Sequence, residues 1–352
     1  MRILIVAPWF RTLAHLYGRL LTNVGHEVLV IASDRQFEAG YGFCDEIVFG
    51  GLGNSALTGN RIVRTVRAIR KFAPEVVIEE PFTHPRWLPL PGNTRRILML
   101  HEPVPGRDSV RLDRKRRLVA HLQGREISSV ICFSKYAASI ALDAGWRQVD
   151  VVPLISELPE EWVPDFKESR HGFAVVGRIS RNKGIDLAVD AWQELDEDVK
   201  AREPLRLILS EGKDQSTDID RWRRNGVSVH IGRFSFREIV NEISRSRVML
   251  LPYRSAMQSG QQLLAMQLGL VTIVSDMGGL PEYQPDFLPA VTSLDRSQWK
   301  QRMLIEIGID DSSARSNKVR EDYLSRFGNA DTVVAAMQYA IAPRHKVLPN
   351  DQ

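Results

Sequence analysis

The stretch GFAVVGRISRNKG, residues 172–184, joins a short apolar run to a polar turn that glycines flank. Its first part, residues 172–176, is a β-rich run of the kind that forms a buried strand. Gly177 and Gly184 stand on either side of the polar segment, an arrangement typical of a turn from a strand into a helix. The stretch therefore predicts one strand, one turn and the first residues of a helix.

The same alternation of short apolar runs and longer segments of helical period continues on both sides of this stretch. The runs are nearly continuous in Val, Ile and Leu, as expected for parallel strands that helices cover on both faces. This pattern of βαβ units predicts an α/β fold with two doubly wound sheets. The predicted strands are residues 3–6, 27–32, 46–49, 75–78, 95–100, 129–133, 149–152, 172–176, 205–209, 227–231, 248–251 and 270–274.

At 352 residues the chain is longer than one hydrophobic core usually serves, so we expect two domains. Between Pro153 and His171 the sequence lacks a periodic pattern and is rich in proline and acidic residues, which indicates the connection between the two sheets. The predicted organisation is a Rossmann-like domain at 1–155, a hinge at 156–170, a second Rossmann-like domain at 171–330, and a helix and tail at 331–352 that can pack back on the first domain.

Composition is that of a globular protein, with 43% apolar and 26% charged residues. Cys44 and Cys132 lie far apart and match neither a disulfide framework nor a metal cluster, which favours a reducing cytoplasm. The apolar run at residues 2–7 is too short for a signal peptide, and no later stretch reaches the length of a membrane span. We therefore expect a cytoplasmic protein.

Charge is divided unevenly along the chain. Residues 1–150 hold 21 Lys and Arg against 14 Asp and Glu, whereas the remainder holds 26 against 29. Two basic clusters, which include Arg64 with Arg67 and Arg114 with Arg117, predict contact with an acceptor or with anionic lipid at the inner face of the cell membrane. A solvated helix face is the alternative. No nucleic-acid-binding module accompanies the charge, so nucleic acid is not an expected partner.

The turn at residues 177–184 has the residue types that a diphosphate needs. Glycine lets the backbone approach closely, the start of a helix offers N–H groups, and Arg178 and Lys183 can neutralise the two phosphate charges. A glycine turn with two solvated cations is the alternative reading of this turn taken alone.

Open α/β sheets bind ligands beyond the carboxyl ends of their strands, and several further polar or glycine residues follow predicted strands at that edge. Because both predicted sheets carry such residues at their carboxyl edges, we expect a cleft between the two domains, which suits a nucleotide-bearing substrate. The residues concerned are His101, Gly212, Gly232 and the tract 253–261 with Gln258, Ser259 and Gly260.

The order and spacing of these motifs over residues 172–283 resemble the C-terminal domain of the retaining GT-B glycosyltransferases of family 4. The motifs are Gly177-Arg178 with Lys183-Gly184, Gly212, Val229 to Gly232, Leu251-Pro252-Tyr253 and Asp276 to Glu282. The N-terminal half resembles the family more weakly, at residues 1–8, at 25–28 and at His101-Glu102-Pro103.

The resemblance implies a fold of two Rossmann-like domains facing each other across a cleft. It also implies transfer of a sugar, with retention, from a UDP- or GDP-linked donor to a saccharide acceptor that is lipid-linked or part of an exopolysaccharide. No cofactor and no metal ion is implied. Arg178 and Lys183 would hold the diphosphate and stabilise the leaving group, and His101 would approach the donor sugar. Gly177 and Gly212 would border the donor, and the loop with Gly232 and Phe234 would border its nucleobase.

One departure from the family pattern concerns two glutamates. At the positions where most members have these glutamates, this chain has Ala256 and Leu264. Its sequence Gln258-Ser259-Gly260 resembles a bacterial exopolysaccharide branch of the family, in which these three residues would make the donor contacts instead. The departure keeps two alternatives open: a non-catalytic GT-B subunit that binds a nucleotide or a partner, and a nucleotide-sugar epimerase. No Gly-x-Gly-x-x-Gly follows the first strand, which argues against a dehydrogenase, and the eight histidines show no spacing of metal ligands.

Overall fold

The structure of the chain is a computed structural model. It describes residues 1–8, 10–33, 44–49, 59–80, 94–101, 127–163, 170–211, 219–288, 291–309 and 312–342. The chain divides into two compact units. Unit 1 comprises Met1–Phe133, Ala138–Pro153 and the segment that begins at Ala330, and unit 2 comprises Ser134–Ala137 and Leu154–Asn329.

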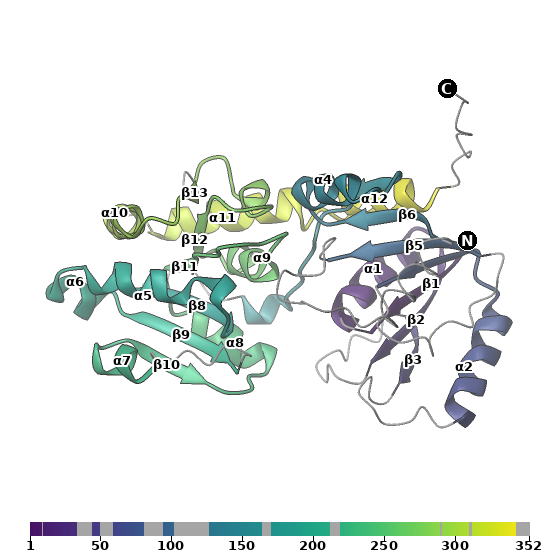
Figure 1. Cartoon of the computed structure of the whole chain (residues 1–352), viewed down its shortest axis with the longest axis horizontal. Helices are drawn as coiled ribbons and strands as arrows, with labels where there is room; N and C mark the ends of the chain where they lie inside the picture. Colours follow the sequence, from purple (N-terminus) through teal and green to yellow (C-terminus); the bar gives the residue numbers. More distant parts are fainter. Residues whose placement is uncertain are drawn as a thin grey trace. The chain divides into compact units, whose positions relative to one another are not determined.

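Unit 1 is a parallel sheet of seven strands in the order β3-β2-β1-β4-β5-β6-β7 (Figure 1). Every strand pair is parallel, and the register pairs Ile3 with Val28 and Ile5 with Ile78. The strands are β1 (Arg2–Ala7), β2 (Glu27–Ser33), β3 (Asp45–Phe49), β4 (Val76–Glu79), β5 (Arg95–Leu100), β6 (Ile127–Cys132) and β7 (Val149–Val151). The described helices are α1 (Arg11–Asn23), α2 (Gly59–Phe72), α4 (Lys135–Asp143), whose first three residues belong to unit 2, and α12 (Ala330–Ile341).

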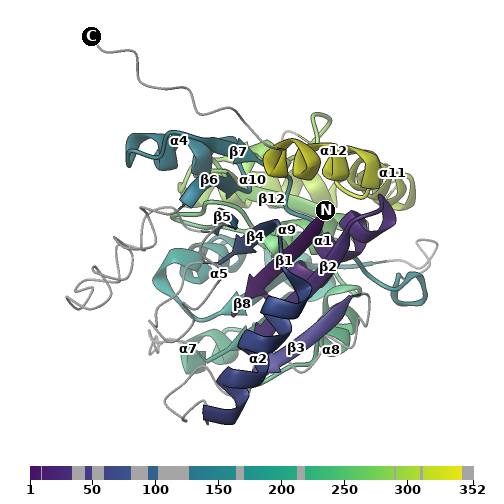
Figure 2. The same ribbon diagram turned by 90° about the vertical axis from the view of Figure 1, so that its right-hand side faces the viewer.

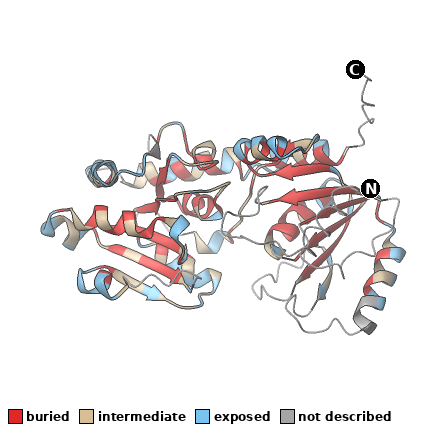
Figure 3. Ribbon diagram, in the orientation of Figure 1, coloured by how far each residue is buried: buried red, intermediate tan, exposed pale blue. Residues whose placement is uncertain are grey.

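Helices cover both faces of the first sheet. Figure 2 shows α2 along one face, where Ile69 and Phe72 join an apolar cluster with Leu4 and Leu29. On the other face α1 comes so close to β2 that a Cβ at Gly18 would stand 3.3 Å from a methyl group of Val28. Because side chains alternate along a strand, covering both faces requires apolar residues at successive positions, and residues 3–7 are all buried (Figure 3).

Helix α12 completes unit 1 although it comes last in the chain. It contacts α1, and Val333, Met337 and Ile341 are buried. The Arg95 guanidinium, at the start of β5, donates hydrogen bonds to the carbonyls of Ala340 and Ile341 at distances of 3.2 and 2.8 Å. A cation at that position satisfies carbonyls that have no partner within the helix.

Unit 2 repeats the architecture with a parallel sheet of six strands in the order β10-β9-β8-β11-β12-β13. Its strands are β8 (Phe173–Arg178), β9 (Leu205–Ser210), β10 (Ser228–Ile231), β11 (Val248–Leu251), β12 (Val271–Ser275) and β13 (Val291–Thr292). Its α-helices are α5 (Ile185–Gln193), α6 (Glu197–Arg202), α7 (Ile219–Arg224), α8 (Phe236–Ile243), α9 (Gly260–Gln267), α10 (Arg296–Ile307) and α11 (Ser312–Arg326). Its described residues also form the short 3-10 turns η2 (Glu160–Trp162), η3 (Arg181–Lys183) and η4 (Pro281–Tyr283).

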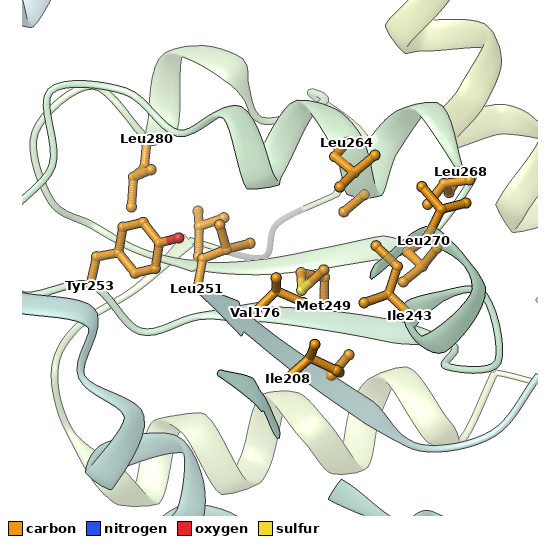
Figure 4. Packing of buried hydrophobic residues seen from close by; sticks show 14 of the residues in the cluster. Val176, Ile208, Ile243, Met249, Leu251, Tyr253, Leu264, Leu268, Leu270 and Leu280 are labelled. Carbon is orange, nitrogen blue, oxygen red and sulfur yellow. The ribbon is translucent and has the colours of Figure 1, made fainter. Parts of the chain in front are cut away.

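The core of unit 2 is an apolar cluster between the sheet and helices α8 and α9 (Figure 4). Strand residues such as Val176 and Leu251 meet Ile243 of α8 and Leu264 of α9 in this cluster. Helix α8 begins with a capping box, in which Ser235 and Glu238 satisfy each other's backbone N–H groups.

All twelve predicted strands are present, each within two residues of its predicted bounds, and the predicted α/β class is confirmed. Strand β13 was not predicted, because a run of two residues carries no periodic signal. Residues 154–162, most of them in the predicted hinge, are bound to unit 2: Tyr283 Oη accepts from the Leu154 backbone at 3.0 Å, and Glu160 pairs with Arg320 at 2.7 Å.

Candidate functional site

The strand order of unit 2 reverses between β8 and β11, which are neighbours in the sheet but not in the chain. At such a switch point the loops that follow the two strands run in opposite directions and leave room for a ligand at the carboxyl edge of the sheet. The turn after β8 and the loop after β11 therefore make the candidate site.

The turn after β8 has a backbone that only glycine adopts without strain. Gly177 has φ 141° and Gly184 has φ 59°. A Cβ at Gly184 would stand 1.9 Å from the Pro252 carbonyl oxygen, so the turn and the loop after β11 touch through their backbones. Arg178 is exposed as the last residue of β8, and Lys183 closes η3.

Lys183 and Tyr253 form the centre of the site. The Lys183 ammonium lies 3.7 Å from the centroid of the Tyr253 ring. Tyr253 is buried, and its hydroxyl accepts a hydrogen bond from Ser259 Oγ at 3.3 Å. A Cβ at Gly177 would lie 3.6 Å from Lys183 Cε. Two residues predicted to bind the donor, Lys183 and Ser259, thus contact one tyrosine, and a third, Gly177, lies beside Lys183. The sequence indicated Tyr253 only as part of the motif Leu251-Pro252-Tyr253 in the family resemblance.

Helix α9 directs its N-terminus to the same edge. It begins at Gly260 with Ser259 as N-cap residue, and the Ser259 side chain does not cap the helix. A Cβ at Gly260 would meet nothing within 4 Å, so space is open at the first turn. The first N–H groups of a helix attract anions, so this end suits a phosphate. Gln258 is half-buried just before it.

The loop between Tyr253 and Ser259 is held by close backbone contacts. The Gly279 N–H donates to the Ala256 carbonyl at 3.2 Å, and Ser134 Oγ donates to the Met257 carbonyl at 2.7 Å. A Cβ at Gly278 would stand 1.8 Å from the Ala256 oxygen. The sequence marked the glycines of this turn but gave no sign of Ser134, which is far away in the chain.

Of the residues predicted near the nucleobase, Gly232 follows β10 and Phe234 precedes α8. Phe234 packs against the apolar cluster, and a Cβ at Gly232 would lie 3.9 Å from its ring. They stand at the carboxyl edge of the outermost strand, two strands from β8. Gly212 lies outside the described residues.

His101 belongs to unit 1, just after β5. Its Nε2 lies 3.4 Å from Glu80 Oε1, and its ring contacts those of Phe10 and Phe133 in tilted arrangements, at centroid distances of 3.9 and 4.6 Å. The other Glu80 oxygen accepts from the Phe10 backbone at 3.3 Å. Glu80 is 2% exposed and follows β4, which borders the switch point of this sheet. Sequence reasoning missed Glu80.

Arg64 and Arg67 lie exposed on α2, whose opposite side buries Ile69 in unit 1. Arg114 and Arg117 lie outside the described residues. No described helix combines the length and the apolar character that crossing a bilayer requires. Among the described residues, no group of three His, Cys, Asp or Glu side chains is placed to hold a metal ion.

Residues 170–299, which span the sheet of unit 2, match the family model described as glycosyl transferases group 1. A comparison with curated proteins finds no match.

Solved structures resemble the whole chain. HepE of Anabaena in complex with UDP-glucose is 13% identical, with 97% of this chain and 100% of that chain covered at a TM-score of 0.68. A trehalose-6-phosphate protein from E. coli, bound with UDP-2-fluoro glucose, is 11% identical, with 98% and 100% covered at 0.66. Sucrose-phosphate synthase of Thermosynechococcus elongatus is 17% identical, with 96% and 98% covered at 0.65.

At these identities the likeness shows the fold, and it agrees with the two parallel sheets and their strand orders. The chain therefore has the GT-B glycosyltransferase fold, and its residues 170–299 carry the sequence pattern of the glycosyl transferases group 1.

Proposed function

We propose that the chain is a retaining glycosyltransferase that moves a sugar from a nucleoside diphosphate sugar to a saccharide acceptor and needs no metal ion. The observation that supports this most directly is the Lys183 ammonium, 3.7 Å from the Tyr253 ring and beside the glycine turn at the β8 and β11 switch point. The N-terminus of α9 opens at the same edge. Together they form a cradle for a diphosphate.

In the proposed reaction, the bond between the anomeric carbon and the diphosphate oxygen breaks, and the diphosphate keeps the electron pair. The acceptor hydroxyl oxygen bonds to that carbon on the same face, and its proton passes to the departing diphosphate oxygen. Negative charge therefore grows on the diphosphate as the bond breaks. Lys183, Arg178 and the first N–H groups of α9 would stabilise that charge.

The donor is UDP-linked or GDP-linked in this proposal, and UDP is the first choice. Two of the similar structures hold a UDP-sugar, which supports this choice. Gln258, Ser259 and Gly260 would contact the donor, and Gly232 with Phe234 would border its base. His101 of unit 1 is proposed to act on the donor sugar.

A thermal-shift screen with UDP, GDP, ADP and their sugar conjugates tests the donor site, because a ligand that binds the native state raises its melting temperature. We expect a selective shift with UDP or GDP that Lys183→Ala and Arg178→Ala abolish. Lys300→Ala, on α10, is the matched control and should keep the shift. Absence of any shift for the unaltered chain would contradict the proposal.

The acceptor is proposed to be a lipid-linked or exopolysaccharide chain, reached from the cytoplasmic face of the membrane. Arg64 and Arg67 are exposed on a helix that has no acidic residue in its first turn and has Arg70 and Lys71 in its last. Flotation with vesicles of anionic and of neutral lipid tests this surface. Binding to anionic vesicles only, weakened by Arg64→Gln with Arg67→Gln, is the expected result.

A second candidate function is nucleotide binding without catalysis. Leu264 is 2% exposed within the apolar cluster, so position 264 offers no acid to a donor, and Ala256 offers none either. A nucleotide shift without consumption of any donor sugar, tested with a panel of acceptors, would favour this candidate over transfer.

A further inference from the structure

Arg254, the residue after Tyr253, ties the loop after β11 to the turn after β8. Its backbone N–H donates to the Asn182 carbonyl at 2.8 Å. Its guanidinium donates to the Arg181 carbonyl at 3.0 Å and to both carboxylate oxygens of Asp186 at 2.8 and 2.6 Å. The side chain and the backbone of Arg254 together therefore hold three residues close to Lys183 in the sequence, two through the guanidinium and one through the backbone N–H.

Arg254 and Asp186 form a bidentate ion pair, in which two guanidinium nitrogens donate to the two carboxylate oxygens. Such a pair fixes the orientation of both planar groups, which a single contact from a lysine would not do. The Arg254 hydrogen bonds hold the pKa of Asp186 below its ordinary value, so this side chain is a carboxylate near neutral pH. The two side chains are 33% and 48% exposed, and an ion pair exposed to this extent adds little to the stability of a fold.

The ion pair of Asp186 and Arg254 lies close in the sequence to Lys183 and Tyr253, and this position indicates its role. Asp186 lies three residues after Lys183, in the first turn of α5. A carboxylate there without a partner would attract the Lys183 ammonium, which is the cation proposed to meet the diphosphate. It would also repel the diphosphate itself. Arg254 removes both effects, because its guanidinium neutralises the carboxylate and holds it in one place.

Arg254 is not itself a good candidate for direct contact with the substrate. Its Nη1 already donates to Arg181 and to Asp186, and its Nη2 donates to Asp186. Lys183, in contrast, has its ammonium against the face of Tyr253, a contact made through its charge, so the ammonium can still donate hydrogen bonds to a diphosphate.

We propose that Asp186 and Arg254 are positioning residues for the diphosphate site, in which Arg254 keeps the Asp186 carboxylate from competing for Lys183. This inference rests on the proposed function. It predicts an unequal effect of the two single changes: loss of Arg254 leaves the Asp186 carboxylate without its cationic partner, whereas loss of the Asp186 charge leaves no carboxylate to compete. It also predicts that removing the carboxylate rescues the loss of Arg254.

Calorimetric titration of the full chain with UDP and GDP, each compared with its nucleoside, tests the proposal. We expect Arg254→Gln to weaken binding of the preferred diphosphate about tenfold and to change nucleoside binding less than about twofold. Asp186→Asn should cost about threefold or less, and the double variant should return to about that level. Arg296→Gln, which breaks the exposed pair of Arg296 with Glu194 elsewhere in unit 2, is the matched control and should change neither.

Each contrary result has a distinct meaning. Equal weakening of diphosphate and nucleoside by Arg254→Gln would make the pair merely structural and overturn the inference. A double variant no better than Arg254→Gln would overturn the role of the carboxylate. If the unaltered chain bound neither UDP nor GDP, the proposed function would fail and the inference with it. If Arg254→Gln does not fold, Arg254→Lys replaces it in the titration, because lysine keeps the positive charge but cannot make the bidentate contact with Asp186.

Discussion

The two sheets share a strand order around their switch points but carry opposite chemistry there. In unit 2, the switch point has glycines, Lys183 and a helix N-terminus, all suited to an anion. In unit 1, the strands at the corresponding place, β1 and β4, lead to a buried carboxylate, Glu80, with His101 beside it. Topology thus decides where a ligand can bind, and the residues on the loops decide which ligand it is.

The largest effect should come from breaking the turn of unit 2. Gly184→Ala forces a left-handed backbone on alanine and puts its Cβ 1.9 Å from the Pro252 oxygen. We expect a loss of about 3 kcal/mol or more in the free energy of unfolding, together with loss of nucleotide binding.

Urea unfolding checks this, with Gly25→Ala in unit 1 as the control. Gly25 also has a positive φ, 87°, but a Cβ there would meet nothing within 4 Å. A loss of about 1 kcal/mol is expected for it. Equal losses for the two variants would show that the contact with Pro252 does not matter.

The next effect separates the chemistry of the two units. Lys183→Ala should raise the dissociation constant for UDP or GDP roughly 100-fold, since it removes a cation from the diphosphate. His101→Ala should leave that constant within about twofold and lower the rate of sugar transfer roughly 100-fold. Titration calorimetry and a transfer assay measure the two quantities. Loss of nucleotide affinity in the His101 variant would contradict the assignment of nucleotide binding to unit 2 and of catalysis to His101.

A smaller effect should follow from the ring under Lys183. Tyr253→Leu removes an aromatic face worth about 1 kcal/mol to a cation, so nucleotide affinity should fall about fivefold. Tyr253→Phe keeps the ring and loses only the hydrogen bond from Ser259, so most of the affinity should remain. If both variants bound alike, the ring face would not be what holds the ammonium.

The smallest effect concerns pH. Hydrogen bonds from Arg254 lower the pKa of Asp186 in the folded chain, so the stabilisation it provides is present above the ordinary carboxyl pKa of about 3.9. It is lost as pH falls through the lowered value. Melting curves between about pH 3 and 7 should show Asp186→Asn below the unaltered chain at neutral pH, with the difference shrinking under acid conditions. A constant difference across that range would contradict this.

Sequence reasoning predicted the strands and the turn at 177–184 because both leave local signals, apolar runs and glycine spacing. It could not predict that Lys183 would lie over Tyr253, that Arg254 would bind Asp186, or that Glu80 would face His101. Each of these contacts joins two segments that follow different strands. Such contacts depend on strand order, and no periodicity in one segment carries that information.

Helix α12 has a consequence for how the chain is made. Because unit 1 takes its last helix from the end of the chain, its apolar surface at α1 stays uncovered while all of unit 2 is synthesised. Unit 2 is continuous over Leu154–Asn329 apart from Ser134–Ala137, so its own core can close first. The domain that begins the chain is thus the one that is completed last, and a ribosome that stops before Ala330 would release a finished second unit beside an unfinished first.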